Sequence, residues 1–213
     1  MDWLRGFRDG LVNYFRQRMG LALSVLLVLA AGVVAGALAA GSLGGDVKQE
    51  LVDVLQLFFR GLSREGGSPS PVSLLRVSAL KNLRDAGLLW ILGVTVVGFP
   101  GVLGVIFIRG FALGFTVGFL VDQTGFKGII LALFSIFPQN ILAIPALTVI
   151  AVAALSFSLT LFRNRFGRHH TGFYQELAAY SLLVATMAGI LLGSSLIEAF
   201  IAPVFLRLMA PMV

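Results

Sequence analysis

Cysteine is absent from the sequence, histidine occurs only twice, and charged residues make up only 12% of its 213 residues. Without cysteine, a disulfide framework, a thiolate zinc site, an iron–sulfur cluster and a cysteine nucleophile are all excluded. Charged residues are about 25% of a typical soluble domain, so this chain has too few to cover a water-exposed surface. Hydrophobic residues make up 58% of the chain. We therefore expect an all-α, polytopic integral membrane bundle, with about five transmembrane helices.

The charges that are present are mostly basic, with a formal net charge of +6. The arginines lie beside apolar runs rather than in a dense cluster, which favours contact with membrane lipids over nucleic acid. Residues 1–18 combine arginines with Trp3, Phe7 and Tyr14, which is typical of an amphipathic helix in the membrane interface. Residues 163–176 contain a second basic segment. Because basic loops remain cytoplasmic, we expect both segments in the cytoplasm and the C-terminus outside a multi-pass protein of the cell membrane.

The apolar runs divide the chain, which we treat as one membrane domain, into spans. The first span is predicted at 20–43; Ala37-Leu38-Ala39 resembles a signal-peptide cleavage site, but the apolar run is longer than that of a signal peptide. Residues 44–86 are predicted to form extracytoplasmic amphipathic helices around a linker rich in glycine, serine and proline. Further spans are predicted at 87–108, 110–121, 127–161 and 177–202. The segment 110–121 is short, so it either crosses the membrane or is re-entrant.

Glycines spaced four residues apart are the strongest local pattern. Such spacing places small residues on one helix face and lets another helix approach closely. We expect these glycines to pack helices within one chain, and the alternative is an interface between copies in a homo-oligomer. The residues concerned are Gly32, Gly36, Gly110, Gly114, Gly118, Gly189 and Gly193.

Pro138, Gln139 and Asn140 interrupt an apolar run. Proline removes a backbone hydrogen bond, and the two amides need partners at a depth where water is scarce. Such groups either close a packing network or line a polar path through the membrane. We favour the packing network, because a transport path needs more polar groups than these.

Arg109 and Asp122 bracket the glycine-rich segment and are interpreted as anchors at its two ends. In this interpretation Arg109 lies at the cytoplasmic interface and Asp122 at the outer one. A buried Arg109 would instead need a carboxylate or carbonyl partner. Glu198, near the outer end of the last span, is an unsuitable partner.

No pattern in the sequence supports a catalytic or cofactor site. His169 and His170 are adjacent and lack the carboxylate or cysteine companions of a metal site. Serine and threonine have no histidine and aspartate partners in a triad pattern, and no phosphate-binding loop of the Walker type occurs. We therefore predict that the protein is not an enzyme and has no cofactor.

The order of several short motifs nevertheless suggests a family. Lys81-Asn82-Leu83-Arg84-Asp85-Ala86 is followed by Arg109-Gly110-Phe111, Asp122, Phe137-Pro138-Gln139-Asn140 and Ser156-Phe157-Ser158-Leu159. This succession, over nearly the whole chain, resembles the stage II sporulation protein M family of spore-forming Firmicutes. Within that resemblance, Asn82, Arg109 and Asp122 are the family-motif positions.

The resemblance implies a non-enzymatic role in engulfment, when the mother-cell membrane migrates around the forespore. It implies a scaffold in the septal or engulfing membrane for two partners that remodel the cell wall. These are stage II sporulation protein D, a lytic transglycosylase, and protein P, an amidase/endopeptidase. The alternative from the residues themselves is a transporter or permease-like subunit with a polar site at Pro138-Gln139-Asn140.

Overall fold

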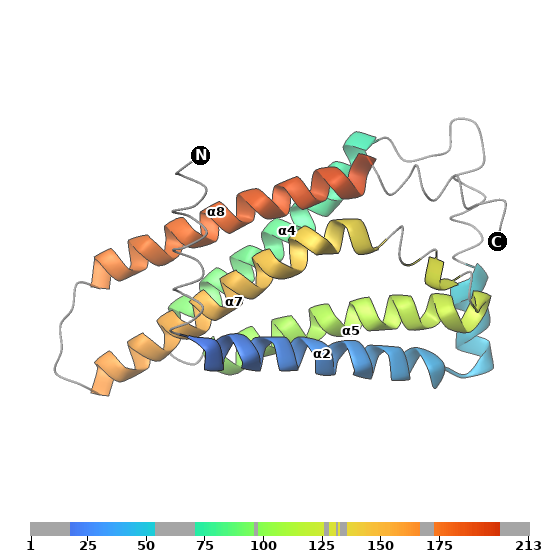
Figure 1. Ribbon diagram of the computed structural model, residues 1–213, viewed down its shortest axis with the longest axis horizontal. Helices are drawn as coiled ribbons and strands as arrows, with labels where there is room; N and C mark the ends of the chain where they lie inside the picture. The colour runs from blue at the N-terminus through green and yellow to red at the C-terminus, as the bar shows by residue number, and fades with distance from the viewer. Residues whose placement is uncertain are drawn as a thin grey trace.

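The computed structural model describes residues 18–53, 71–95, 98–125, 128–130, 132, 136–166 and 173–200. The described residues contain no strand and form a bundle of long helices (Figure 1). The expected interfacial helix at 1–18 and the basic residues 167–172 lie almost entirely outside this part of the chain, as do the linker and the C-terminal tail. The long helices are α2 (Met19–Gly41), α4 (Pro71–Val94), α5 (Gly98–Thr124), α7 (Phe137–Phe166) and α8 (Phe173–Phe200).

The first and last helices agree with the predicted spans at 20–43 and 177–202 to within a few residues. Residues 19–41 contain neither a charged residue nor a proline, so nothing in α2 opposes an unbroken apolar helix. In α8, Glu176 lies in the first turn, where a carboxylate is favourable beside the positive end of the helix dipole.

The predicted boundary between 87–108 and 110–121 is wrong. Helix α4 ends at Val94 instead, the Gly98 N–H donates to the Thr95 carbonyl (3.1 Å), and α5 continues from Gly98 through Arg109 to Thr124. Proline is tolerated in a first helical turn, which is where Pro100 lies, so the new helix begins just before it. At the turn, the Thr95 hydroxyl donates to the carbonyl of Leu92 (2.7 Å). A side chain at Gly98 would clash with that same carbonyl, so this close turn requires glycine.

The predicted span at 127–161 also begins later in the structure. The continuous helix α7 starts at Phe137, which places Pro138 in its first turn, and it extends to Phe166. Pro145 remains inside the helix.

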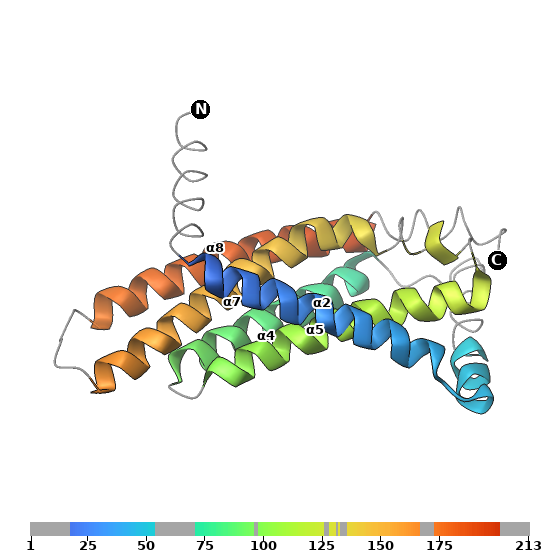
Figure 2. The ribbon, with the colours of Figure 1, turned by 60° about the horizontal axis from the view of Figure 1, so that its bottom comes forward.

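The glycine contacts determine the direction of the helices. Leu29 lies opposite Gly110, Val33 opposite Gly114 and Ala37 opposite Gly118, so α2 and α5 run parallel. Two parallel neighbours need a connection that crosses back between them. Helix α4 makes that crossing, beside α8 and α7 (Figures 1 and 2).

Among the described residues, four helices are long and apolar enough to span a membrane by length and composition alone, and α4 is not one of them. Its charges led us to assign residues 71–86 to an extracytoplasmic segment, but they form the first two thirds of a crossing helix. That assignment is corrected by the contacts of Asn82 and Asp85, which face the other helices of the bundle.

Helix α7 occupies the centre of the bundle. It contacts α2, α4, α5 and α8, and 78% of its most apolar window is buried, against 22–33% for the other three apolar spans. Residues 146–158 are buried without interruption. The remaining helices surround α7, which leaves their outer faces for lipid or for other proteins.

Candidate functional site: a polar network inside the bundle

Arg109 lies deep in the bundle rather than at the cytoplasmic interface where we expected it. At roughly 1.5 Å per residue, it is about 16 Å from the start of α5 at Gly98 and about 20 Å from Asp122. This is close to the middle of a hydrocarbon layer about 30 Å thick. An arginine at that depth needs a partner from the protein.

The partner of Arg109 is Asp85 of α4. The Arg109 Nη1 to Asp85 Oδ2 distance is 2.9 Å, and each side chain is only 13% exposed. Arg109 Nη2 also donates to Oδ1 of Asn82, one turn earlier on α4 (3.3 Å). The Arg109 Nε is buried without a hydrogen-bond partner. The charge is thus neutralised inside the bundle, and it links α5 to α4.

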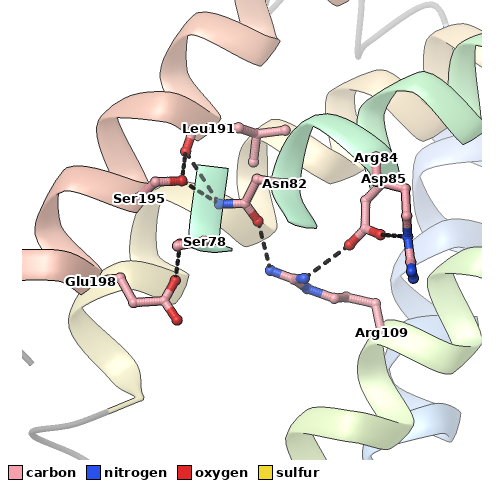
Figure 3. A network of polar contacts seen from close by, with 8 residues as sticks. All are labelled: Ser78, Asn82, Arg84, Asp85, Arg109, Leu191, Ser195 and Glu198. Carbon is pink, nitrogen blue, oxygen red and sulfur yellow. Dashed lines mark hydrogen bonds and ion pairs between the residues drawn. The ribbon is translucent and has the colours of Figure 1, made fainter. Parts of the chain in front are cut away.

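Asn82 extends this network to α8. Its Nδ2 donates to the Ser195 hydroxyl (2.9 Å) and to the Leu191 carbonyl (3.3 Å), and Asn82 itself is only 2% exposed. Ser195 donates in turn to the Leu191 carbonyl (3.0 Å). Figure 3 shows the amide of Asn82 between the arginine and α8. Asn82 therefore joins three helices with one side chain.

A second polar group lies farther toward the outer ends of α4 and α8. The Ser78 hydroxyl donates to the carboxylate of Glu198 (Figure 3). With its amide nitrogen turned toward that carboxylate, Gln139 donates to it as well. The Ser194 hydroxyl donates to the Gln139 backbone carbonyl (2.9 Å). Glu198 is therefore not a partner of Arg109, as expected, and it ties α8 to α4 and α7.

The sequence analysis did not identify Asp85 and Ser78 as members of a site. The available signal was their spacing: Ser78, Asn82, Asp85 and Leu89 recur every three or four residues and so share one helix face. We divided this helix at residue 86, so the residues of this face were assigned to two different segments.

Asn140 and Gln139 do not line a hydrophilic path in the described part of the chain. The Asn140 Nδ2 donates to the Ile136 carbonyl in the preceding turn (2.7 Å), and the side chain is buried with its Oδ1 unpaired. A pocket of about 410 Å³ beside Asn140 is otherwise lined by apolar side chains and Gly114. Pro138, Gln139 and Asn140 together make the first turn of α7.

Five of the seven predicted glycines lie where α2 and α5 touch. A Cβ at Gly32 or Gly36 would meet the backbone carbonyl of Phe107 or Phe111, and one at Gly110 or Gly114 would meet that of Leu29 or Val33. A Cβ at Gly118 would lie 2.9 Å from the Cα of Ala37. Gly189 and Gly193 on α8 differ from the expectation, since nothing lies within 4 Å of a Cβ added at either.

Asp122 lies near the C-terminal end of α5, the end that the sequence analysis predicts to be the outer one. Its carboxylate pairs with Lys48 (2.8 Å), and both side chains are partly exposed. Lys48 belongs to a helical segment at 45–53 that follows α2. A partly exposed ion pair of this kind is typical of the level at which a helix leaves the bilayer, so Asp122 marks that level on α5.

No group of three potential metal-ligating side chains occurs among the described residues. His169 and His170 lie outside them. The charged and polar side chains of the site bond to one another and to backbone carbonyls of neighbouring helices. This arrangement holds helices together at fixed depth and rotation.

These features define a class: an all-α, multi-pass membrane bundle tied by an internal ion pair and buried amides. A sequence model of the family described as Stage II sporulation protein M matches residues 25–203. The chain belongs to this family, as its motifs suggested, and is thus a membrane protein of a sporulation family. Neither the curated proteins nor the solved structures contain a significant match.

Proposed function

We propose that the protein is a non-enzymatic membrane scaffold that recruits peptidoglycan hydrolases during engulfment. The observation that carries the proposal is the pairing of the charged and amide groups of α4, α5 and α8 inside the bundle. Arg109 is paired with Asp85, and Asn82 with Ser195, so these groups stabilise a rigid body. A rigid bundle with long exposed apolar faces is suited to hold other membrane-anchored proteins. The proposed partners are stage II sporulation proteins D and P, and the proposed location is the septal membrane.

The proposal is tested by deleting the gene in a spore-forming host that carries fluorescent fusions of the two hydrolases. We expect both fusions to disperse around the membrane and engulfment to stall, with recovery when the wild-type chain is supplied. Normal septal localisation of both hydrolases in the deletion strain would contradict the scaffold role.

A transporter remains the second candidate, because an intramembrane ion pair often marks an ion or substrate path. Two observations give it less support. The Asn140 amide is bonded to the backbone of its own helix, and the neighbouring pocket is apolar. Efflux or uptake measured in vesicles that contain only this protein would favour the transporter instead.

A further inference from the structure

Helix α4 has a second face that the internal network does not use. Arg76, Lys81 and Arg84 are exposed on the side of α4 that points away from the bundle. Apolar residues stand between them, including Val77 at 68% and Leu80 at 59% exposure. We refer to Arg76, Lys81 and Arg84, with Val77 and Leu80, as the cationic face of α4.

The ion pair to Arg109 fixes the depth of this face. Asp85 contacts Arg109 in the middle of α5, so its neighbour Arg84 lies at nearly the same level. That level is about 20 Å from Asp122 along α5, which lies at the outer end of the helix. Arg84 therefore lies near the bilayer midplane, with Lys81 and Arg76 progressively closer to the outer surface.

The cations of this face have little compensation within the described chain. No ion pair of Arg76 or Lys81 is found among the described residues. The Arg84 Nε is 3.9 Å from Asp85, but Asp85 is already bonded to Arg109, and the Arg84 side chain is 75% exposed. A charged side chain that faces lipid at the midplane is costly, and such residues normally pair with another protein group.

A second copy of this chain is a poor occupant. A symmetric interface on α4 would place the cationic face against itself and bring like charges together. The acidic residue of this chain at the depth of Arg84 is Asp85, which Arg109 occupies. The C-terminal residues 201–213 contain Arg207 and neither aspartate nor glutamate.

An anionic lipid headgroup is also a poor occupant. Headgroups lie at the surface of a hydrocarbon layer about 30 Å thick, so they are at least about 15 Å from the midplane. A headgroup could reach Arg76 near the outer surface, but Arg84 is too deep for one. The occupant must carry its negative charge into the hydrocarbon layer, and a membrane-spanning helix with an aspartate or glutamate does so.

We infer that the cationic face of α4 docks a membrane-spanning helix of another protein, with a carboxylate opposite Arg84 near the bilayer midplane. Val77 and Leu80 provide the apolar contact, and Arg84 and Lys81 select for the acidic residue. The inference rests on the proposed scaffold function and names the chemistry by which one partner is recognised.

The test is site-specific photocrosslinking in the membranes of the native host. A benzophenone amino acid is placed at Leu80 in the cationic face or, as a control, at Leu182 on α8, which is 71% exposed. Crosslinked peptides are sequenced. We expect the Leu80 probe to capture an apolar segment of a different protein with an aspartate or glutamate in its middle. The Leu182 probe should not capture it.

The charge requirement is then tested with Arg84→Gln. This variant should reduce the Leu80 crosslink to the level of the Leu182 control, while the bundle stays folded because Arg84 is exposed. Exchanging the charges, with Arg84→Asp here and the partner's acidic residue changed to arginine, should restore the crosslink. Capture of a second copy of this chain, of lipid alone, or of a helix with no acidic residue would each overturn the inference.

The failure of this inference is distinguishable from failure of the scaffold role. If Arg84→Gln leaves hydrolase localisation unchanged while deletion of the gene disperses the hydrolases, the scaffold role stands and the cationic face is not the docking surface. If deletion also has no effect, the scaffold role itself fails.

Discussion

At the scale of single residues, Arg109 is the side chain on which the interior depends most. It neutralises Asp85 at 2.9 Å and also donates to Asn82, while both members of the ion pair are largely buried. Removing one member of a buried pair costs about 3–5 kcal/mol, because the other charge is left without a partner. Replacing both members with apolar residues of similar size is often neutral.

We therefore expect Arg109→Gln to lower the stability of the detergent-solubilised protein by several kcal/mol. The double variant Arg109→Leu with Asp85→Leu should be more stable than either single change. The midpoint of thermal unfolding is measured by fluorescence-detected size exclusion. Arg84→Gln is the matched control, since it removes a neighbouring arginine that is 75% exposed and should leave the midpoint unchanged. An equal drop of the unfolding midpoint in Arg84→Gln would contradict the assignment of Arg109 as the arginine that stabilises the interior.

Asn82 makes a different contribution at the same scale, because it uses both ends of its amide. Its oxygen accepts from Arg109, and its nitrogen donates to Ser195 and to the Leu191 carbonyl. Leucine matches the size of asparagine but has neither group. We expect Asn82→Leu to lower the unfolding midpoint, whereas Ser195→Ala should cost less because Asn82 keeps its other two bonds. A larger loss for Ser195→Ala would show that the amide is not the joining group.

At the scale of elements, α2 and α5 form a parallel pair in which backbone touches backbone. Side chains added at Gly36 or Gly114 would meet main-chain carbonyls, which cannot move aside as a flexible side chain does. Crowding of a packed site typically costs about 1–3 kcal/mol, and this contact is closer than most.

We expect Gly114→Ala to separate α2 from α5 and to lower the unfolding midpoint. Gly193→Ala is the control, because a Cβ there has open space, and alanine favours a helix by roughly 1 kcal/mol relative to glycine. The control should leave the midpoint unchanged or raise it.

Helix α4 shows why composition alone underestimates a span. Its Asn82 and Asp85 face the bundle, and its Arg76, Lys81 and Arg84 face outward, so it has too many charges to resemble a membrane helix. Two thirds of this helix therefore looked like an extracytoplasmic segment. What makes it a crossing helix is the pairing of Asp85 with Arg109 and the parallel direction of α2 and α5.

At the scale of the whole molecule, the direction of the helices gives a testable topology. Helices α2, α5 and α8 run in one direction, and α4 and α7 run in the other, so an odd number of crossings separates the termini (Figure 1). Basic residues precede α2 and follow α7, so we expect that end of the bundle in the cytoplasm.

Reporter fusions check this topology directly. Alkaline phosphatase should be inactive, and green fluorescent protein bright, when fused after His170. The reverse should hold for fusions after Val213 and for insertions near Gly67. If α4 did not cross, Gly67 and the turn between α4 and α5 would report the same side, and the fusion after Val213 would report the cytoplasm.

The sequence by itself determined the class of this protein, because low charge, long apolar runs and glycines at helical spacing are local properties. It also determined the family, from the order of its motifs, and it predicted close helix packing at glycines without identifying which helices meet. The tertiary structure decided the role of Arg109 and the crossing of α4. Arg109 and Asp85 are 24 residues apart, and no local pattern states that they meet. A charged residue in a membrane helix is an anchor at the membrane surface or a member of a buried ion pair, depending on which residues lie opposite it. Only the tertiary packing determines those neighbours.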